Sequence, residues 1–404
     1  MVSSRNLKWC GGLLLGVLVV PGALALDGDQ VLIGASFARM HDNNLFRLSD
    51  DANTAAVLGR DDRGDDVSRT GVSLAIDKQL SLQRLRVNAA AQDVAYGTYS
   101  TLDHRATQVG AQWLWAVQDW ATGKVASSRD RTLTGFADFR PGSALKNLET
   151  RMEHRFDADI RLGVDWHLDA GAVRRTVDNS SSARQTSDYE ISERLLGVRH
   201  VSAAGREVGV RYRWTSGEYP NRLLAPTLDN RFRQDNVDLT VRLPVSGASR
   251  VSGTVGRVER RYDDVPARNY AGSNGRIAWD WMPGGKSSMT LAARRELVTQ
   301  EDFNASFLDI RGLTWTPVWM LTEHLTLQGS VEKSRRSHEG DPGFFPLGLP
   351  TRVDRIRSSV VSLAYEPRRW FSFSAAVQED RRTSNYAGLQ YRARMVTLSG
   401  SVQF

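Results

Sequence analysis

The sequence predicts an all-β protein: a transmembrane antiparallel β-barrel of the bacterial outer membrane. Three observations lead to this prediction. An export-type segment opens the chain, short segments of alternating apolar and polar residues recur after it, and the last of them, 395–404, ends on Phe404. Successive side chains of a strand point to opposite faces, so alternation creates one apolar and one polar face. A barrel wall between lipid and water requires that pattern.

Residues 1–25 have the features of a secretory signal peptide. Positive charges at Arg5 and Lys8 precede the apolar run Leu13–Val20, and an A-x-A cleavage motif ends the segment at Ala25. The apolar run is much shorter than the roughly 20 residues that a membrane-spanning helix needs. We therefore expect removal of this segment during export and a location in the outer membrane.

The rest of the chain, 26–404, has no linker or shift in composition and is expected to form a single barrel domain. The mean hydropathy of the whole chain is −0.39, and no stretch after residue 25 is apolar enough for a membrane helix. The single cysteine, Cys10, precedes the cleavage motif, so disulfides and thiolate metal sites are excluded. The net charge is +7. In an exported protein this charge favours anionic solutes or lipid headgroups over nucleic acid.

Alternation places the strands one by one. In the third segment, for example, Leu85 and Val87 share one face while Arg84 and Arg86 share the other. The strands number about 18, with about 16 as the alternative. Their expected ranges are 30–39, 68–79, 82–97, 103–116, 123–138, 148–161, 167–177, 188–201, 206–217, 235–244, 249–263, 269–281, 287–300, 304–318, 324–336, 354–366, 370–382 and 388–404.

The connections alternate in length. Long polar loops such as 40–67 and 337–353 alternate with tight turns such as 202–205 and 367–369. Outer-membrane barrels have short periplasmic turns and longer outer loops, so both termini are expected on the periplasmic side. Most tryptophans lie in or near the short turns, which predicts an aromatic girdle at that rim. Phe404 is expected to close the barrel, since the last strand must leave no open edge.

The segment His41–Leu48 reads H-D-N-N-L-F-R-L. It resembles the D-x-N-L-F-R-L stretch of EpsL-like outer-membrane proteins of exopolysaccharide operons, a group of β-barrel porins. The general layout of the chain is similar as well. The resemblance implies a family motif formed by Asn43, Asn44, Leu45, Phe46, Arg47 and Leu48. It also implies a channel that exports an exopolysaccharide, with outer-membrane lipids, the barrel-assembly machinery and possible periplasmic export proteins as partners.

Charged residues on the polar faces are the candidates for the wall of the lumen. They are Arg84, Arg86, Glu207, Arg211, Arg213, Asp238 and Arg242. Arginine binds carboxylate or phosphate in bidentate fashion, which suits an acidic polymer. The alternative is that these charges pair with one another across strands and serve the barrel wall itself.

The search for catalytic signals is negative. No metalloprotease, nucleophile-elbow, Walker or dinucleotide motif occurs. We expect no enzyme, cofactor or metal site. The acidic loop 40–67 is expected to be solvated rather than to hold calcium, and an inward fold into the lumen is left open. The alternative to polysaccharide export is a general or substrate-specific diffusion porin.

Overall fold

A closed antiparallel sheet of eighteen strands forms the molecule. The computed structural model describes residues 29–137, 145–222, 230–263, 265–298, 305, 307–340 and 350–404. Each strand pairs with its neighbours in sequence, and β1 pairs with β18 to close the ring. The predicted fold class is confirmed, with the higher of the two strand counts. The predicted signal peptide, 1–25, lies outside the described residues.

The strands are long and follow the predicted ranges closely. They are β1 (Gln30–Asp42), β2 (Asp65–Leu80), β3 (Gln83–Tyr96), β4 (His104–Val117), β5 (Ala121–Leu133), β6 (Leu148–Leu162), β7 (Trp166–Asn179), β8 (Tyr189–Val201), β9 (Glu207–Glu218), β10 (Arg231–Ser246), β11 (Ser249–Tyr262), β12 (Tyr270–Gly284), β13 (Ser287–Val298), β14 (Phe307–Met320), β15 (Leu325–Glu339), β16 (Val353–Arg368), β17 (Phe371–Ser384) and β18 (Tyr391–Gln403).

Two strand ends depart from the expected ranges by more than three positions. β5 ends at Leu133 instead of residue 138, and the next N–H, that of Thr134, still donates to the carbonyl oxygen of Asn147 just before β6. β10 begins at Arg231, four positions before the expected start, and pairs there with Glu218 of β9.

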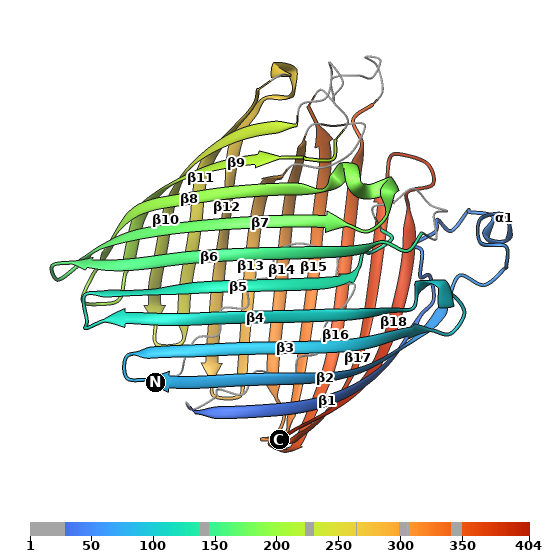
Figure 1. Cartoon of the computed structure of the whole chain (residues 1–404), viewed down its shortest axis with the longest axis horizontal. Helices are drawn as coiled ribbons and strands as arrows, with labels where there is room; N and C mark the ends of the chain where they lie inside the picture. Colours follow the sequence, from blue (N-terminus) through green and yellow to red (C-terminus); the bar gives the residue numbers. More distant parts are fainter. Residues whose placement is uncertain are drawn as a thin grey trace.

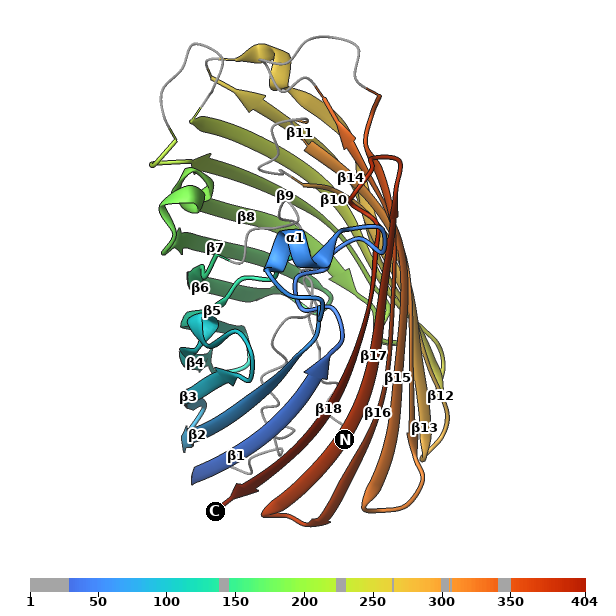
Figure 2. The same ribbon diagram turned by 90° about the vertical axis from the view of Figure 1, so that its right-hand side faces the viewer.

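The two walls of the barrel cross in projection. β1–β7 run across the view of Figure 1, whereas β13–β18 behind them run up it. This crossing arises because strands of a closed barrel tilt by about 40° from its axis, in opposite senses on the near and far walls as seen from one side. α1 (Thr54–Leu58) lies beyond the strand ends on the side opposite the short turns, and Figure 2 turns it toward the viewer.

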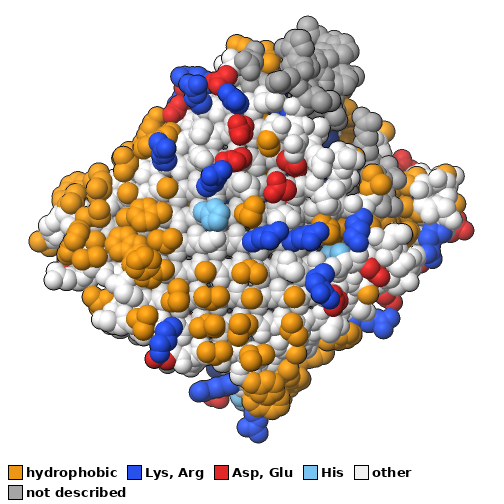
Figure 3. Space-filling model, in the orientation of Figure 1, with side chains coloured by type: hydrophobic (Ala, Val, Ile, Leu, Met, Phe, Trp, Pro, Cys, Tyr) orange, Lys and Arg blue, Asp and Glu red, His pale blue; other side chains and the backbone are white. Residues whose placement is uncertain are grey.

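The outer surface carries the apolar half of each alternating pattern. Large apolar side chains stand exposed on nearly every strand, and in Figure 3 they gather toward the turn ends, while charged side chains gather toward the loop ends. Members of this exterior band are Val31, Ile33, Phe37, Val72, Val109, Val125, Phe156, Leu196, Val208, Leu239, Val255, Ile277, Leu313, Val361, Val377 and Leu398. A face of this kind is stable only against lipid.

Tryptophans mark the turn-end rim of that band. Trp120, Trp166, Trp319 and Trp370 are each about half exposed beside short turns, and Trp279 donates its indole N–H to the Ser249 hydroxyl at 2.7 Å. The rings thus place an apolar body in lipid and a polar edge toward water. Among the described residues, no helix is long and apolar enough to cross a membrane.

Phe404 lies at the seam between the first and last strands. Its N–H donates to the Ile33 carbonyl oxygen at 2.9 Å, and its own carbonyl oxygen accepts from the Ile33 N–H at 2.8 Å. Its ring stacks on Trp370 with centroids 6.0 Å apart. The seam therefore continues to the last residue, and the ring joins the turn-end aromatic rim.

Candidate functional site

The inner face of the sheet carries ion pairs that run from strand to strand. All seven charged residues singled out in the sequence lie on the face opposite the exposed apolar band, and each arginine among them has an acidic partner. The structure groups them into three clusters, which also contain charged residues outside the predicted set.

The first cluster centres on Asp77 of β2. Arg84 Nε and Nη2 bind its two carboxylate oxygens at 2.6 and 2.8 Å, and Arg86 Nε binds Oδ2 at 2.9 Å. The Asp77 side chain is only 1% exposed. Two arginines of β3 thus share one buried carboxylate.

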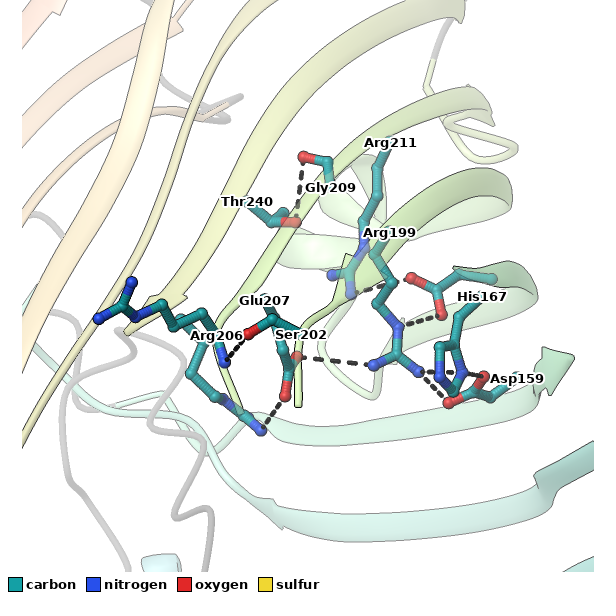
Figure 4. Close-up of polar contacts among 11 residues, drawn as sticks. Asp159, His167, Arg199, Ser202, Arg206, Glu207, Gly209, Arg211 and Thr240 are labelled. Atoms are coloured by element: carbon teal, nitrogen blue, oxygen red, sulfur yellow. Dashed lines mark hydrogen bonds and ion pairs between the residues drawn. The ribbon is translucent and has the colours of Figure 1, made fainter. Parts of the chain in front are cut away.

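The second cluster centres on Arg199 of β8, which lies between acids from three strands (Figure 4). Its Nε is 3.0 Å from Asp169 Oδ1, its Nη1 is 3.5 Å from Glu207 Oε2, and its Nη2 contacts Asp159. His167 Nδ1 lies 2.6 Å from the second oxygen of Asp159. Arg199 therefore joins β6, β7 and β9 through charge-assisted contacts.

Two predicted residues complete this second cluster. Arg211 Nη2 lies 3.3 Å from Asp169 Oδ2, and Arg242 Nη1 lies 3.1 Å from Glu207 Oε1. The predicted Glu207 is therefore shared by Arg199 and Arg242. The network extends over β6–β10 as one continuous patch of charge.

The third cluster pairs Arg213 of β9 with Asp238 of β10, at 3.1 Å between Nη2 and Oδ2. Glu193 of β8 lies 3.6 Å from Arg213 Nε. The Asp238 side chain is 2% exposed, because the glycine opposite, Gly256, leaves room for it against β11. Asp238 is thus the most deeply buried carboxylate of the second and third clusters.

A recess of about 190 Å³ adjoins the second cluster. Arg199, Arg211 and Arg242 line it together with Arg276 of β12. Arg276 is exposed and forms no ion pair within the part of the chain that the structure describes. Glu207 is the one acid among the lining residues that the structure describes, so the recess has an excess of positive charge.

The wall across the barrel is rich in hydroxyl groups toward its turn end. Around the ring of eighteen, β17 lies nine places from β8. Ser372 and Ser374 of β17 contact Ser401 and Ser399 of β18 at 2.7 Å between oxygens. The inner surface thus sets a charged wall against a hydroxyl wall, and both suit hydrophilic solutes.

The motif 43–48 packs against the inner faces of the neighbouring strands. Leu45, Phe46 and Leu48 are buried with Met40, Val67, Tyr96 and Leu102. The Phe46 ring lies 4.7 Å, centroid to centroid, from both Tyr99 and Phe136. Burial raises the pKa of the Tyr99 phenol, which faces this cluster. The motif therefore forms a small core inside the loop end of the barrel, whereas α1 stands beyond the strand ends (Figure 1).

A buried ion pair holds the turn of the motif. Arg47 Nη1 lies 2.7 Å from Asp42 Oδ2, with exposed fractions of 2% and 0% for the two side chains. Asp42 Oδ1 also accepts the Asn44 N–H at 2.9 Å, and the Asn44 side chain bonds both the N–H and the carbonyl oxygen of Leu48. Arg47 takes a left-handed backbone angle, φ 57°, so these bonds define a tight turn. Asn43 bonds the Arg394 N–H at 2.7 Å.

A second connection also lies inside the barrel. Ala137, which follows β5, is buried against Tyr391 and Ala393 of β18. Its carbonyl oxygen accepts from Arg382 Nη1 of β17 at 2.7 Å, and Arg382 Nη2 lies 2.6 Å from Asp354 of β16. The chain leaving β5 therefore reaches the inner faces of β16–β18, where it narrows the loop end.

The sequence analysis missed Arg199, Asp159, Asp169 and Arg276. All four lie on the polar parity of predicted strands, so the signal was present, but parity alone marks many residues equally. The five predicted arginines also create a weaker positive field in the lumen than unpaired arginines would, because each of them has an acidic partner. Among the described residues, no group of three or more His, Cys, Asp or Glu could hold a metal ion. Acidic side chains of the loop 40–67 accept local hydrogen bonds. Asp62, for example, accepts the Gly64 N–H at 2.8 Å.

No protein-family model matches the sequence, and no curated protein matches it. Solved structures share its fold. OccK2 (OpdF) of Pseudomonas aeruginosa has a TM-score of 0.50 at 9% identity and covers 93% of this chain and 99% of its own. OpdQ of the same organism gives 0.50 at 11% identity, with 93% and 98% covered. The siderophore receptor PirA of that species gives 0.45 at 8%, with 93% and 80% covered.

The chain folds as a porin-like outer-membrane β-barrel. The lipid-facing exterior, the closed sheet of eighteen strands and the shared fold all agree on this point. Identities this low establish the fold alone. The matches give no support to the EpsL-like family, so polysaccharide export stays a hypothesis that rests on residues 43–48.

Proposed function

We propose that this outer-membrane barrel is a diffusion channel for small hydrophilic solutes and that it favours anions. Arg276 carries the proposal. It extends from β12 into the recess beside Arg242 and Arg211, with no acidic partner in the described part of the chain. A guanidinium that keeps its donors free for a solute carboxylate or phosphate is a selectivity element. The two solved porin-like neighbours with TM-scores of 0.50 support a channel fold.

The paired arginines have a different part in this proposal. Arg84, Arg86, Arg211, Arg213 and Arg242 line the lumen, and they form a fixed ladder of ion pairs with Asp77, Asp169, Glu207 and Asp238. Such a ladder orients dipolar solutes, while the opposite hydroxyl wall offers donors and acceptors without charge. The inward Phe46 cluster and the Ala137 segment narrow the outer mouth, which favours small solutes over a thick polymer.

Conductance through planar bilayers tests this function. In a salt gradient, the native barrel should show a reversal potential displaced toward anions, and Arg276→Gln should reduce that displacement while the barrel still folds. The matched control is Arg233→Gln on β10, which removes an exterior arginine 76% exposed beside Asp263. Equal reversal potentials for the native barrel and the Arg276 variant would show that this residue does not set selectivity.

Export of an exopolysaccharide is the second candidate, and the His41–Leu48 resemblance favours it. Liposome swelling separates the two. A diffusion channel admits gluconate and disaccharides rapidly, and its deletion leaves polymer secretion intact. A barrel that is closed to small sugars but whose loss stops secretion of a surface polymer would establish the export function.

A further inference from the structure

We propose that the outside of β14–β17 binds the phosphate groups of an outer-leaflet glycolipid. Six cationic side chains meet there: Arg311, Lys333, Arg335, Arg355, Arg357 and Arg381, here called the β14–β17 cationic patch. All six are exposed. They line a recess of about 520 Å³ on the barrel wall. None of them belongs to the channel site described above.

Register shows that the patch faces lipid. Across β14 and β15, Trp315 is opposite Val331, Leu313 is opposite Lys333, and Arg311 is opposite Arg335. Directly opposed residues share one face of a sheet, and Leu313 and Trp315 belong to the exposed apolar exterior. The cations therefore continue the lipid-facing rows.

Height along the barrel identifies the leaflet. The cations begin one pair beyond Trp315, toward the ends of β14–β17 that carry the loops. A step of two residues along a strand is about 7 Å. The patch thus starts where the hydrocarbon layer gives way to headgroups, on the side opposite the short turns. That side is the outer leaflet of the outer membrane.

The patch is unusual because like charges oppose one another directly. Arg335 is opposite Arg311 on one side and Arg355 on the other, and Arg357 is opposite Lys333 and Arg381. Opposed like charges on neighbouring strands destabilise a sheet. The two rows of three cations therefore repel one another and reduce the stability of the folded barrel.

Two nearby acids are already engaged. Asp309 forms ion pairs with Arg295 and Arg311. Glu379 forms ion pairs with Arg392 and Arg394. Within the part of the chain that the structure describes, Lys333, Arg335, Arg355, Arg357 and Arg381 form no ion pair. Exterior cations on the other half of the barrel include paired ones: Arg105 with Asp93, Arg174 with Glu190 and Arg261 with Glu259. Five of the six cations in the patch therefore have no ion-pair partner among the described residues, and the lipid headgroups beside them can provide anions.

Phosphate is the group that fits. Guanidinium groups bind phosphate oxygens in bidentate fashion and are more weakly hydrated than ammonium groups. A glycolipid that carries phosphates on its sugar headgroup and acyl chains below can satisfy the two rows of cations and the apolar rows under them together. A free anion can bind the rows of cations but does not cover the apolar rows below them.

The test compares lipid A carrying both phosphates with the same lipid after enzymatic dephosphorylation. Each is added to the purified barrel in a neutral detergent, and binding is measured by native mass spectrometry and heat-unfolding. The variant is Arg335→Gln/Arg355→Gln/Arg357→Gln. The control, Arg105→Gln/Arg174→Gln/Arg261→Gln, removes the same charge from acid-paired exterior sites.

Phosphorylated lipid A should bind the native barrel more tightly than the dephosphorylated form. The patch variant should lose on the order of 100-fold in affinity, since each basic residue near an anionic surface contributes roughly fivefold. The control should lose little. Without lipid, the patch variant should be at least as stable as the native barrel, because its like-charge contacts are relieved; this checks folding.

Three results would overturn the proposal. One is equal affinity for the two lipids, which indicates apolar contact alone. Another is an equal loss in the control variant, which indicates general charge attraction. The third is full stabilisation of the native barrel by inorganic phosphate without lipid, which indicates a site for a free anion.

Discussion

Removal of the Arg47 side chain should open the motif turn at the loop end. In Arg47→Ala, the Asp42 carboxylate keeps its burial, with 0% exposure, but loses its cationic partner at 2.7 Å. Breaking a buried ion pair from one side costs about 3–5 kcal/mol, since a charge is left without compensation. Both side chains are fully enclosed, so solvent screening does not reduce this figure.

That cost corresponds to a rise of roughly two to three and a half powers of ten in the population of the open turn. Hydrogen exchange measures it directly. The N–H groups of Asn44 and Leu48 bond side-chain oxygens within the turn, at 2.9 and 2.8 Å. Both should exchange faster in the variant by that factor, while amides in the middle of β1 and β2 keep their protection.

The double variant Asp42→Asn/Arg47→Met supplies the control, because it removes both charges and retains volume. It should recover most of the lost protection, to within about 1–2 kcal/mol of the native turn. The reasoning is refuted if the single variant accelerates exchange less than tenfold, or if the double variant is protected no better than the single one.

Three further predictions concern the barrel wall. Phe404→Asp should lower the yield of heat-modifiable barrel on gels, because it removes the ring stacked on Trp370 at the seam; a native yield would contradict a closing role. Gly256→Ala should lower the unfolding midpoint, because a Cβ there overlaps the Val237 carbonyl oxygen and the Asp238 side chain. The expected loss of stability is about 1–3 kcal/mol. The control, Gly247→Ala, has open space around the new Cβ and should leave the midpoint unchanged. Arg84→Gln/Arg86→Gln should destabilise the barrel by leaving Asp77 buried and unpaired, and adding Asp77→Asn should restore it; no rescue in urea unfolding would show that the arginines act otherwise.

The strands and their faces were predictable because both depend on local pattern. Each wall segment separates lipid from water, so every second residue must be apolar, and a shift by one position reverses all of its side chains. Residues such as Leu85 and Arg84 therefore identify their own faces. Strand ends were less predictable: β5 stops at Leu133, before the alternating segment ends, because the length of a strand depends on how far its partner, here β6, runs beside it.

Partnerships across the barrel needed the tertiary structure. Parity places Arg84 and Arg213 on the inner face, but it does not pair them with Asp77 and Asp238, because pairing depends on register and on side-chain reach. The same holds for Arg382, which meets Ala137 from 245 positions earlier in the chain.

By itself, the sequence determined that this chain has a lipid-facing band, a polar interior and about eighteen strands, since the period-two alternation encodes these features locally. The tertiary structure decided where charge is neutralised and where it is left over. Register on the inner face brings acids to most arginines, yet leaves Arg276 without one among the described residues. On the outer face, register places Arg335 between Arg311 and Arg355, because strand pairing aligns residues by hydrogen-bond geometry and not by charge.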